Sequence, residues 1–284
     1  KNNDNLKDME MNFFKITVSL NLVKLTMFKF IKFDIDGPCC FITLNRPEVY
    51  NAFNEEMLNE LQDAFKKISE DNNIRAVGLT GEGKAFSSGQ DLKSFNEKNS
   101  GFKDALDNRY NPLIRSIADL DKPVVCGLNG VAAGAGMSLA LACDIRIASE
   151  SASMTEVFIN VGLVPDSGSS FYLPRLVGFA KAFELCLTAE KISARDAYRM
   201  GLVNKLVNAG LFRDYFVRYV KAISEKPTKS VAMIKSLLKK SFESSLSEML
   251  DLESKYQEIA GATDDFREGV NSFLEKRKPV FKGK

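Results

Sequence analysis

Short apolar runs mark the first part of the chain and predict strands. The β-prone runs at residues 28–35 and 39–44 flank the turn tripeptide Asp36-Gly37-Pro38, which is typical of a β-hairpin. From residue 54 to residue 70, apolar side chains recur at helical spacing behind Asn54, a favoured N-cap residue. We therefore expect a hairpin followed by one amphipathic helix.

Three further apolar runs, at residues 76–80, 124–128 and 145–148, predict strands, and a helix at about 112–120 precedes the second of them. Alternation of strands and helices indicates a largely parallel sheet with covering helices. We expect the segment 154–164 to end the sheet core and the remainder to be helical. The helices expected there span residues 179–187, 193–200, 211–224, 228–242, 246–259 and 264–276, the second with Ser193 and Asp196 as a capping pair.

The first 27 residues differ from the rest, being rich in Asn and Lys and then weakly apolar. Lys15 and Lys24 limit the uncharged run to eight residues, which is too short for a membrane span. A signal peptide is the less favoured alternative, because no convincing cleavage site closes the run. We expect residues 1–27 to be an N-terminal tail without a part in the chemistry.

Composition excludes several function classes. Apolar residues make up 45% and charged residues 27% of the 284 residues, which is ordinary for a soluble globular protein. A net charge of +2 gives no sustained basic face, so nucleic acid is not an expected partner. The five cysteines are odd in number and lack C-x-x-C spacing, so we expect reduced thiols in a cytosolic protein and no metal site.

The chain contains no histidine. This absence removes the commonest general base, together with every Ser-His-Asp or Cys-His arrangement. Acid–base work must therefore be done by carboxylates, Lys, Tyr or Cys.

Two glycine-containing turns follow predicted strands, one at residues 83–93 and one at 129–136. Gly134 and Gly136 flank Ala135, so the backbone can approach a bound atom there, and the first amides of the next helix have no helical partner. Two backbone donors on separate turns could converge on one oxygen as an oxyanion hole. The alternative is that Gly and Ala only allow close packing on a sheet.

At these turns the chain resembles the enoyl-CoA hydratase/isomerase, or crotonase, superfamily. The motifs are Ala85-Phe86-Ser87-Ser88-Gly89-Gln90-Asp91-Leu92 and Asn129-Gly130-Val131-Ala132-Ala133-Gly134-Ala135-Gly136. Residues 109–113, 162–166 and 266–277 also look like the phenylacetate-pathway 2-(1,2-epoxy-1,2-dihydrophenyl)acetyl-CoA isomerases. The resemblance covers residues 28–284 and implies a ClpP/crotonase-like α/β fold, a spiral of ββα units. It divides the chain into a core at 28–205 and a helical region at 206–284 that builds a homotrimer or a dimer of trimers.

The resemblance also implies a site. It places the oxyanion donors at the backbone N–H groups of Gln90 and Ala135, where they would hold a thioester carbonyl oxygen as an enolate forms. The two glutamates of family hydratases map to Ser138 and Phe158, which cannot transfer protons, so isomerisation is favoured over hydration. Glu156 is a substitute if the local alignment slips, and otherwise an ordinary surface glutamate.

Asp166 matches the aspartate that acts in the ring-epoxide isomerases, and we expect it to be the catalytic base. The alternative is a turn aspartate that caps the next helix. Asp144 and Asp91 are expected to hold structure by hydrogen bonding, Asp91 by bracing the oxyanion turn. Coenzyme A, present only as part of the substrate, would contact Ala52, Ser88, Gln90, Asp91, Leu92 and Lys93, with Phe281 reaching across from a neighbouring subunit.

The sequence thus favours a cytoplasmic acyl-CoA isomerase without metal, separate cofactor, nucleic-acid or membrane partner. It would convert 1,2-epoxyphenylacetyl-CoA to its oxepin, or 3-enoyl-CoA to 2-enoyl-CoA. Two alternatives stay open: a 2-enoyl-CoA hydratase, and a non-catalytic homologue that binds acyl-CoA or RNA.

Overall fold

The computed structural model describes residues 28–93 and 101–284, so the expected tail at residues 1–27 lies outside the described residues. A six-stranded sheet forms the centre, in the order β1-β2-β3-β5-β7-β10. The strands of this sheet are β1 (Ile31–Asp36), β2 (Cys39–Leu44), β3 (Ala76–Gly81), β5 (Val124–Leu128), β7 (Ile145–Ser149) and β10 (Lys205–Val207). Only the β1–β2 hairpin is antiparallel among these pairs, because crossovers connect the other strands.

A second sheet of short strands runs in the order β4-β6-β8-β9. Its members are β4 (Ala85–Ser87), β6 (Val131–Ala133), β8 (Ser153–Thr155) and β9 (Ile192–Ser193). β3, β5 and β7 each lead directly into a strand of this second sheet, β4, β6 and β8 respectively. The chain therefore winds between two sheets in successive units, which is the expected α/β spiral.

Helices cover both faces of the six-stranded sheet. The predicted amphipathic helix is α2 (Glu55–Glu70), and the Asn54 side chain caps it by accepting a hydrogen bond from the Met57 N–H at 3.0 Å. Its apolar face packs in the main core with Cys40, whereas Cys39 faces the opposite layer under α9 (Phe212–Ser224). The alternation of strand side chains thus separates two apolar layers.

The expectation that the sheet core ends at residue 164 is wrong. β10 pairs in parallel with β7, and β9 pairs with β8, although both lie beyond that point. Strands of two or three residues are too short to show a periodicity of their own, so only the fold reveals them. Helix α6 (Ser169–Val177) was also not predicted, because Pro174 inside it signals a break.

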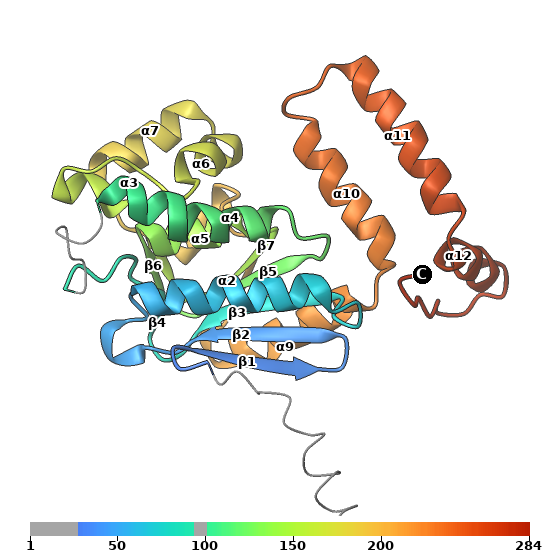
Figure 1. Ribbon diagram of the computed structural model, residues 1–284, viewed down its shortest axis with the longest axis horizontal. Helices are drawn as coiled ribbons and strands as arrows, with labels where there is room; N and C mark the ends of the chain where they lie inside the picture. The colour runs from blue at the N-terminus through green and yellow to red at the C-terminus, as the bar shows by residue number, and fades with distance from the viewer. Residues whose placement is uncertain (1–27, 94–100) are drawn as a thin grey trace, which may run out of the picture.

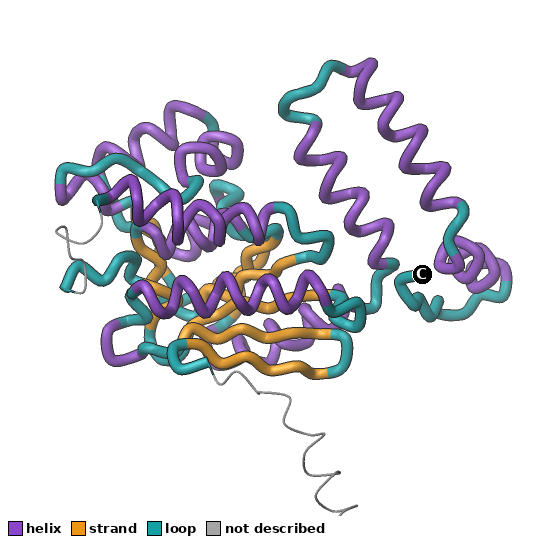
Figure 2. Tube along the Cα trace, in the orientation of Figure 1, coloured by secondary structure: helices purple, strands orange, loops and turns teal. Residues whose placement is uncertain are grey.

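The last third of the chain is mainly helical, as expected. Figure 1 shows α10 and α11 side by side, projecting from the core, with α12 and the C-terminus beyond them. In Figure 2 the strands lie together within the core and this projecting part contains helices and loops alone. The remaining helices are α3 (Phe102–Ala105), α4 (Asn111–Ala118), α5 (Ala135–Ala142), α7 (Phe179–Thr188), α8 (Ala194–Arg199), α10 (Thr228–Lys240), α11 (Leu246–Gly261) and α12 (Asp264–Leu274), with a π-helix at Leu106–Tyr110 and 3-10 turns at Pro47–Val49, Val157–Val161 and Ala209–Leu211.

Two local predictions are confirmed. The Ser193 side chain accepts from the backbone N–H of Asp196 at 3.1 Å and so caps α8. All five cysteines are free thiols, four of them buried and Cys186 partly exposed. No helix among residues 28–93 and 101–284 is long and apolar enough to cross a bilayer.

Candidate active site

The two glycine turns meet. Strand β4 pairs in parallel with β6, which places the loops that follow these strands next to each other. Gly89, with φ +90°, lies so close to the second turn that a methyl group on it would come 2.7 Å from the Ala133 oxygen and 3.3 Å from the Ala135 nitrogen. Only glycine fits here, because any other residue would be strained at this positive φ and its side chain would clash with the neighbouring backbone.

The N–H groups of Gln90 and Ala135 are both available. Phe53 fixes the first turn by donating its N–H to the Gly89 carbonyl at 2.7 Å and accepting from the Asp91 N–H at 2.9 Å. These bonds flank Gln90, whose own N–H donates to no group in the described part of the chain. Ala135 is the first residue of α5, and within the same described ranges its N–H has no acceptor either. Two backbone donors from adjacent turns are thus present, which is the requirement for an oxyanion hole.

The Gln90 side chain is held by a residue that the sequence did not single out. The buried Tyr110 hydroxyl donates a hydrogen bond to Oε1 of Gln90, and Nε2 of Gln90 donates to the Asp91 carbonyl at 3.2 Å. Burial raises the pKa of Tyr110, and the negative charge of Asp166 raises it further. Tyr110 therefore connects the first turn with the neighbourhood of Asp166. In the sequence, Tyr110 could have been found only through the segment at residues 109–113, which is part of the resemblance to the ring-epoxide isomerases.

Asp166 lies on the turn before α6. Its carboxylate accepts a hydrogen bond from the Ser167 hydroxyl at 2.9 Å, while its backbone carbonyl accepts from the Ser169 N–H at 3.0 Å. The carboxylate does not cap the helix, because the N-cap of α6 is Gly168 and no side chain serves it. Burial raises the pKa of Asp166, against the opposing effect of the Ser167 hydrogen bond, and this makes the carboxylate a stronger base.

The two hydratase positions are buried beside the second turn. Phe158 lies 3.9 Å from the place where a side chain of Gly134 would begin. The Ser138 hydroxyl lies 3.2 Å from the Gly134 carbonyl oxygen and 3.0 Å from the Ser169 hydroxyl. Neither residue supplies an acid or a base to the site.

Glu156 is not a surface glutamate, and that interpretation of the sequence is wrong. It is only 1% exposed, and its Oε1 lies 2.7 Å from the Ser169 hydroxyl. Burial raises the pKa of Glu156 to about 7; the Ser169 hydrogen bond lowers it and the Asp166 charge raises it. A second carboxyl group therefore lies within electrostatic reach of Asp166.

Asp91 and Asp144 make the kind of hydrogen bonds expected of them. Asp91 forms an ion pair of 3.0 Å with Arg46, whose guanidinium also donates to the Ala52 carbonyl at 2.6 Å. Asp144 accepts from the Val124 N–H and from the Lys235 ammonium, both at 2.8 Å. Arg46, which the sequence did not single out, thus braces the first turn.

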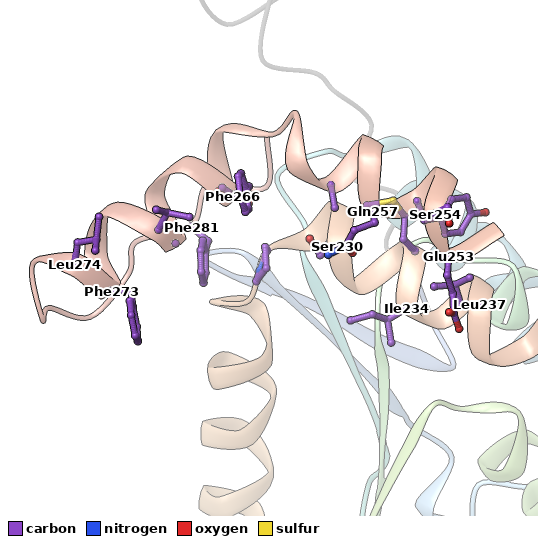
Figure 3. A pocket seen from close by; sticks show the side chains of 17 residues that line it. Ser230, Ile234, Leu237, Glu253, Ser254, Gln257, Phe266, Phe273, Leu274 and Phe281 are labelled. Atoms are coloured by element: carbon purple, nitrogen blue, oxygen red, sulfur yellow. The ribbon is translucent and has the colours of Figure 1, made fainter. Parts of the chain in front are cut away.

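The residues expected to contact coenzyme A fall into two places. Ala52, Ser88, Leu92 and Lys93 share the first turn and its neighbour, with Leu92 and Lys93 exposed. Phe281 lies far from them within the chain, in an apolar cavity of about 1030 Å³ formed by α10, α11 and α12. Figure 3 shows Phe281 near Phe266 among the residues that line this cavity, with Phe273 and Leu274 further out. One chain alone does not bring Phe281 to the turns.

Comparison with known proteins gives the same family. The family model for enoyl-CoA hydratase/isomerase matches residues 34–284. A 1,2-epoxyphenylacetyl-CoA isomerase of Escherichia coli is 40% identical over 91% of this chain and 100% of its own length. A probable enoyl-CoA hydratase of Rhodobacter capsulatus is also 40% identical, over 89% of this chain and 98% of its own.

A solved structure agrees with the fold. The enoyl-CoA hydratase from Bacillus anthracis superposes with a TM-score of 0.86 at 34% identity, covering 90% of this chain and 100% of that one. Sequence and architecture agree along nearly the whole described part. The chain belongs to the enoyl-CoA hydratase/isomerase family and has its crotonase-type fold.

Proposed function

We propose that the protein is an isomerase of acyl-CoA thioesters. It would convert 1,2-epoxyphenylacetyl-CoA to oxepin-CoA, 3-enoyl-CoA to 2-enoyl-CoA, or both. The observation that supports the proposal is the close approach of the two turns at Gly89, where an added methyl group would lie 3.3 Å from the Ala135 nitrogen. Asp166, a half-buried carboxylate of raised pKa, lies close enough to Tyr110 for its charge to raise the Tyr110 pKa, and Tyr110 donates to Gln90 on the first turn.

The chemistry on a 3-enoyl thioester needs one base and one oxyanion site. Asp166 would remove a proton from C2, and the resulting enolate oxygen would be held by the N–H groups of Gln90 and Ala135. The same carboxylic acid would return the proton to C4, which moves the double bond from position 3 to position 2. Each fixed donor of this kind lowers the barrier by about 3 to 4 kcal/mol.

Hydration is the second candidate, because two carboxyl groups, Asp166 and Glu156, lie close enough to interact. A relative named as a probable hydratase is as similar to this chain as the named isomerase. One argument against hydration is that Ser138 and Phe158 occupy the positions of the hydratase glutamates. A hydratase must also hold a water between its two acids, whereas Glu156 is buried against Ser169.

The test compares two substrates with the same enzyme preparation. Isomerisation of 3-hexenoyl-CoA is followed by the absorbance of the conjugated thioester, and hydration of crotonyl-CoA by its loss. We expect isomerisation to exceed hydration by at least about a hundredfold in kcat/KM, the contribution of one missing acid–base group. Equal rates would favour the hydratase, and binding of acyl-CoA without either reaction would favour a non-catalytic homologue.

For the coenzyme A portion of the substrate, we propose contacts with Ala52, Ser88, Gln90, Asp91, Leu92 and Lys93. Of these, Leu92 and Lys93 are exposed and can reach a ligand without movement of the core. Phe281 would contribute from a neighbouring subunit of a trimer or a dimer of trimers, since it lies away from the turns of its own chain.

A further inference from the structure

Glu156, Ser169, Ser138 and the Gly134 carbonyl form a continuous buried chain of polar atoms, here called the Glu156 chain. Successive contacts are 2.7 Å from Glu156 Oε1 to Ser169 Oγ, 3.0 Å from Ser169 Oγ to Ser138 Oγ and 3.2 Å from Ser138 Oγ to the Gly134 oxygen. All three side chains are at most 1% exposed. The Glu156 chain connects a titratable group with the backbone of the second glycine turn.

The number of available protons gives the Glu156 chain a different hydrogen-bond arrangement in each protonation state of Glu156. Each serine hydroxyl has a single proton to donate. If Glu156 is a neutral acid, it donates to Ser169, Ser169 donates to Ser138, and Ser138 donates to the Gly134 carbonyl. If Glu156 is ionised, Ser169 donates to the carboxylate, and the Ser169 oxygen then competes with the Gly134 carbonyl for the single Ser138 proton, which weakens the hydroxyl hydrogen bond to that carbonyl.

The surroundings favour the neutral acid. Glu156 Oε2 is buried and has no hydrogen-bond partner among the described residues. An ionised oxygen without a donor is far more unfavourable in such a place than the carbonyl oxygen of a neutral carboxyl group. The titratable groups that face Glu156 are Asp166, whose charge also favours the neutral form, and Cys186, whose thiol is itself affected by Glu156.

The Gly134 carbonyl matters because it belongs to the same peptide unit as the Ala135 N–H. This carbonyl already accepts the Ser138 N–H of α5 at 2.9 Å, and the Ser138 hydroxyl adds a second donor. Hydrogen bonds to a peptide oxygen polarise the unit and strengthen the hydrogen bond that its N–H donates. The protonation state of the Glu156 chain therefore affects the hydrogen-bond strength of the Ala135 N–H, which is the donor expected to hold the substrate oxygen.

We infer that Glu156 is a positioning residue that controls the strength of the Ala135 oxyanion donor through Ser169, Ser138 and the Gly134 carbonyl. This inference rests on the proposed function, because it assumes that Ala135 N–H binds the thioester oxygen. Glu156 does not touch the substrate. It acts as a neutral acid at the start of the Glu156 chain, and its ionisation draws the Ser169 proton to the carboxylate and the Ser138 proton towards Ser169.

Steady-state kinetics of 3-hexenoyl-CoA isomerisation between pH 6 and 9 test the inference. In the parent, kcat falls about threefold as Glu156 ionises, with little change in KM, because the weakened donor acts in the transition state. Glu156→Gln removes this fall, since its carboxamide N–H donates to Ser169 at every pH. Ser138→Ala lowers kcat about threefold at pH 6 and shows no further fall at high pH, because the Gly134 carbonyl then lacks the hydroxyl donor in both protonation states of Glu156.

Two results of these kinetics would overturn the inference. One is a Glu156→Gln profile with the same alkaline fall as the parent. The other is a Ser138→Ala enzyme with the parent's kcat at pH 6 and the parent's pH profile. Ser138→Ala removes one hydroxyl only, so it keeps the test valid if Glu156→Gln does not fold.

A spectroscopic measurement separates this inference from the proposed function. The infrared stretch of bound hexanoyl-CoA labelled with ¹³C at the thioester carbonyl reports polarisation by the oxyanion donors. At pH 6 we expect a shift to lower frequency on binding to the parent and to Glu156→Gln, and a smaller shift in Ser138→Ala. Binding to the parent without any shift would contradict the oxyanion site itself, whereas equal shifts in all three proteins would contradict only the role of the Glu156 chain.

Discussion

The α-carbon of Gly89 lies against the backbone nitrogen of Ala135, with room for no side chain between the two turns. A methyl group there would come 3.3 Å from that nitrogen and 2.7 Å from the Ala133 oxygen. Because the turns come from separate strands, this close packing of backbone on backbone limits how far apart the two turns can lie. We therefore expect it to matter for the spacing of the proposed donors at Gln90 and Ala135.

We expect Gly89→Ala to lower turnover at least about tenfold and to destabilise the fold by about 1–3 kcal/mol, since it combines strain at φ +90° with a clash. Gly37→Ala is the matched control, because Gly37 has φ +58° and nothing within 4 Å of an added methyl. The control should lose about 1 kcal/mol of stability and no activity. Urea unfolding and 3-hexenoyl-CoA turnover measure both effects. Full activity in a folded Gly89→Ala protein would contradict the role of this contact.

Gln90→Ala should retain turnover within about threefold, since the proposed donor is the backbone N–H. Its stability should fall by about 1–3 kcal/mol, because the buried Tyr110 hydroxyl loses its acceptor. Thermal unfolding and steady-state kinetics separate the two effects. An inactive but folded Gln90→Ala enzyme would show instead that the side chain takes part in the chemistry.

Ala135→Pro removes the second donor outright. Proline is well tolerated at the first position of a helix, which is where Ala135 lies, so the protein should still fold. Turnover should fall by about a hundredfold or more, as for loss of one oxyanion donor. Circular dichroism checks the fold, and activity close to that of the parent would place the oxyanion donor elsewhere.

The elements that could be predicted from sequence are those whose pattern is local. Helices α2 and α9 show an apolar face over several turns, and the Ser193 cap lies three residues from its partner. Strands β4, β6, β8 and β9 have two or three residues each, so only pairing with distant segments defines them. Their positions nevertheless create the contact between the two glycine turns.

The same limit applies to the site. The motif turns identified Gln90 and Ala135 because the donors are backbone groups set by glycine spacing. Glu156 was visible only as one acid in an apolar segment, and its hydrogen-bond partner, Ser169, lies 13 residues further along the chain. Such side-chain contacts depend on how α6 packs against α5, and no local pattern encodes that packing.

The proposed assembly is consistent with the surface of the C-terminal helices. Several of their large apolar side chains are exposed in the single chain, including Phe273 at 82% and Leu274 at 72%. Exposed apolar groups of this kind mark association surfaces. A trimer or a dimer of trimers would cover them, and it would also bring Phe281 of one subunit towards the turns of another.

Stability should depend on pH through Glu156. The folded protein holds this proton up to a pH of about 7, whereas the unfolded chain releases it near 4.5, so the folded state binds more protons between these values. The free energy of unfolding therefore falls as pH rises through this window, by up to roughly 3 kcal/mol. Glu156→Gln cannot ionise and should lose this component. Urea unfolding of both proteins at pH 5 and pH 8 measures it, and equal pH dependence would show that Glu156 ionises as freely as in the unfolded chain.

The proposed base is tested by Asp166→Asn, which preserves the shape of the side chain and an oxygen that can accept from Ser167, but removes basicity. If Asp166 transfers the proton, kcat should fall by at least about a hundredfold while acyl-CoA binding persists. In the parent, kcat should fall as pH is lowered through the pKa of Asp166, which burial raises above 3.8, because protonation removes the base. Asp251→Asn, the same change at an exposed residue of α11, is the control and should leave turnover as in the parent. Turnover of Asp166→Asn within about tenfold of the parent, with unchanged binding, would reduce Asp166 to a structural turn residue and make Glu156 the next candidate for the base.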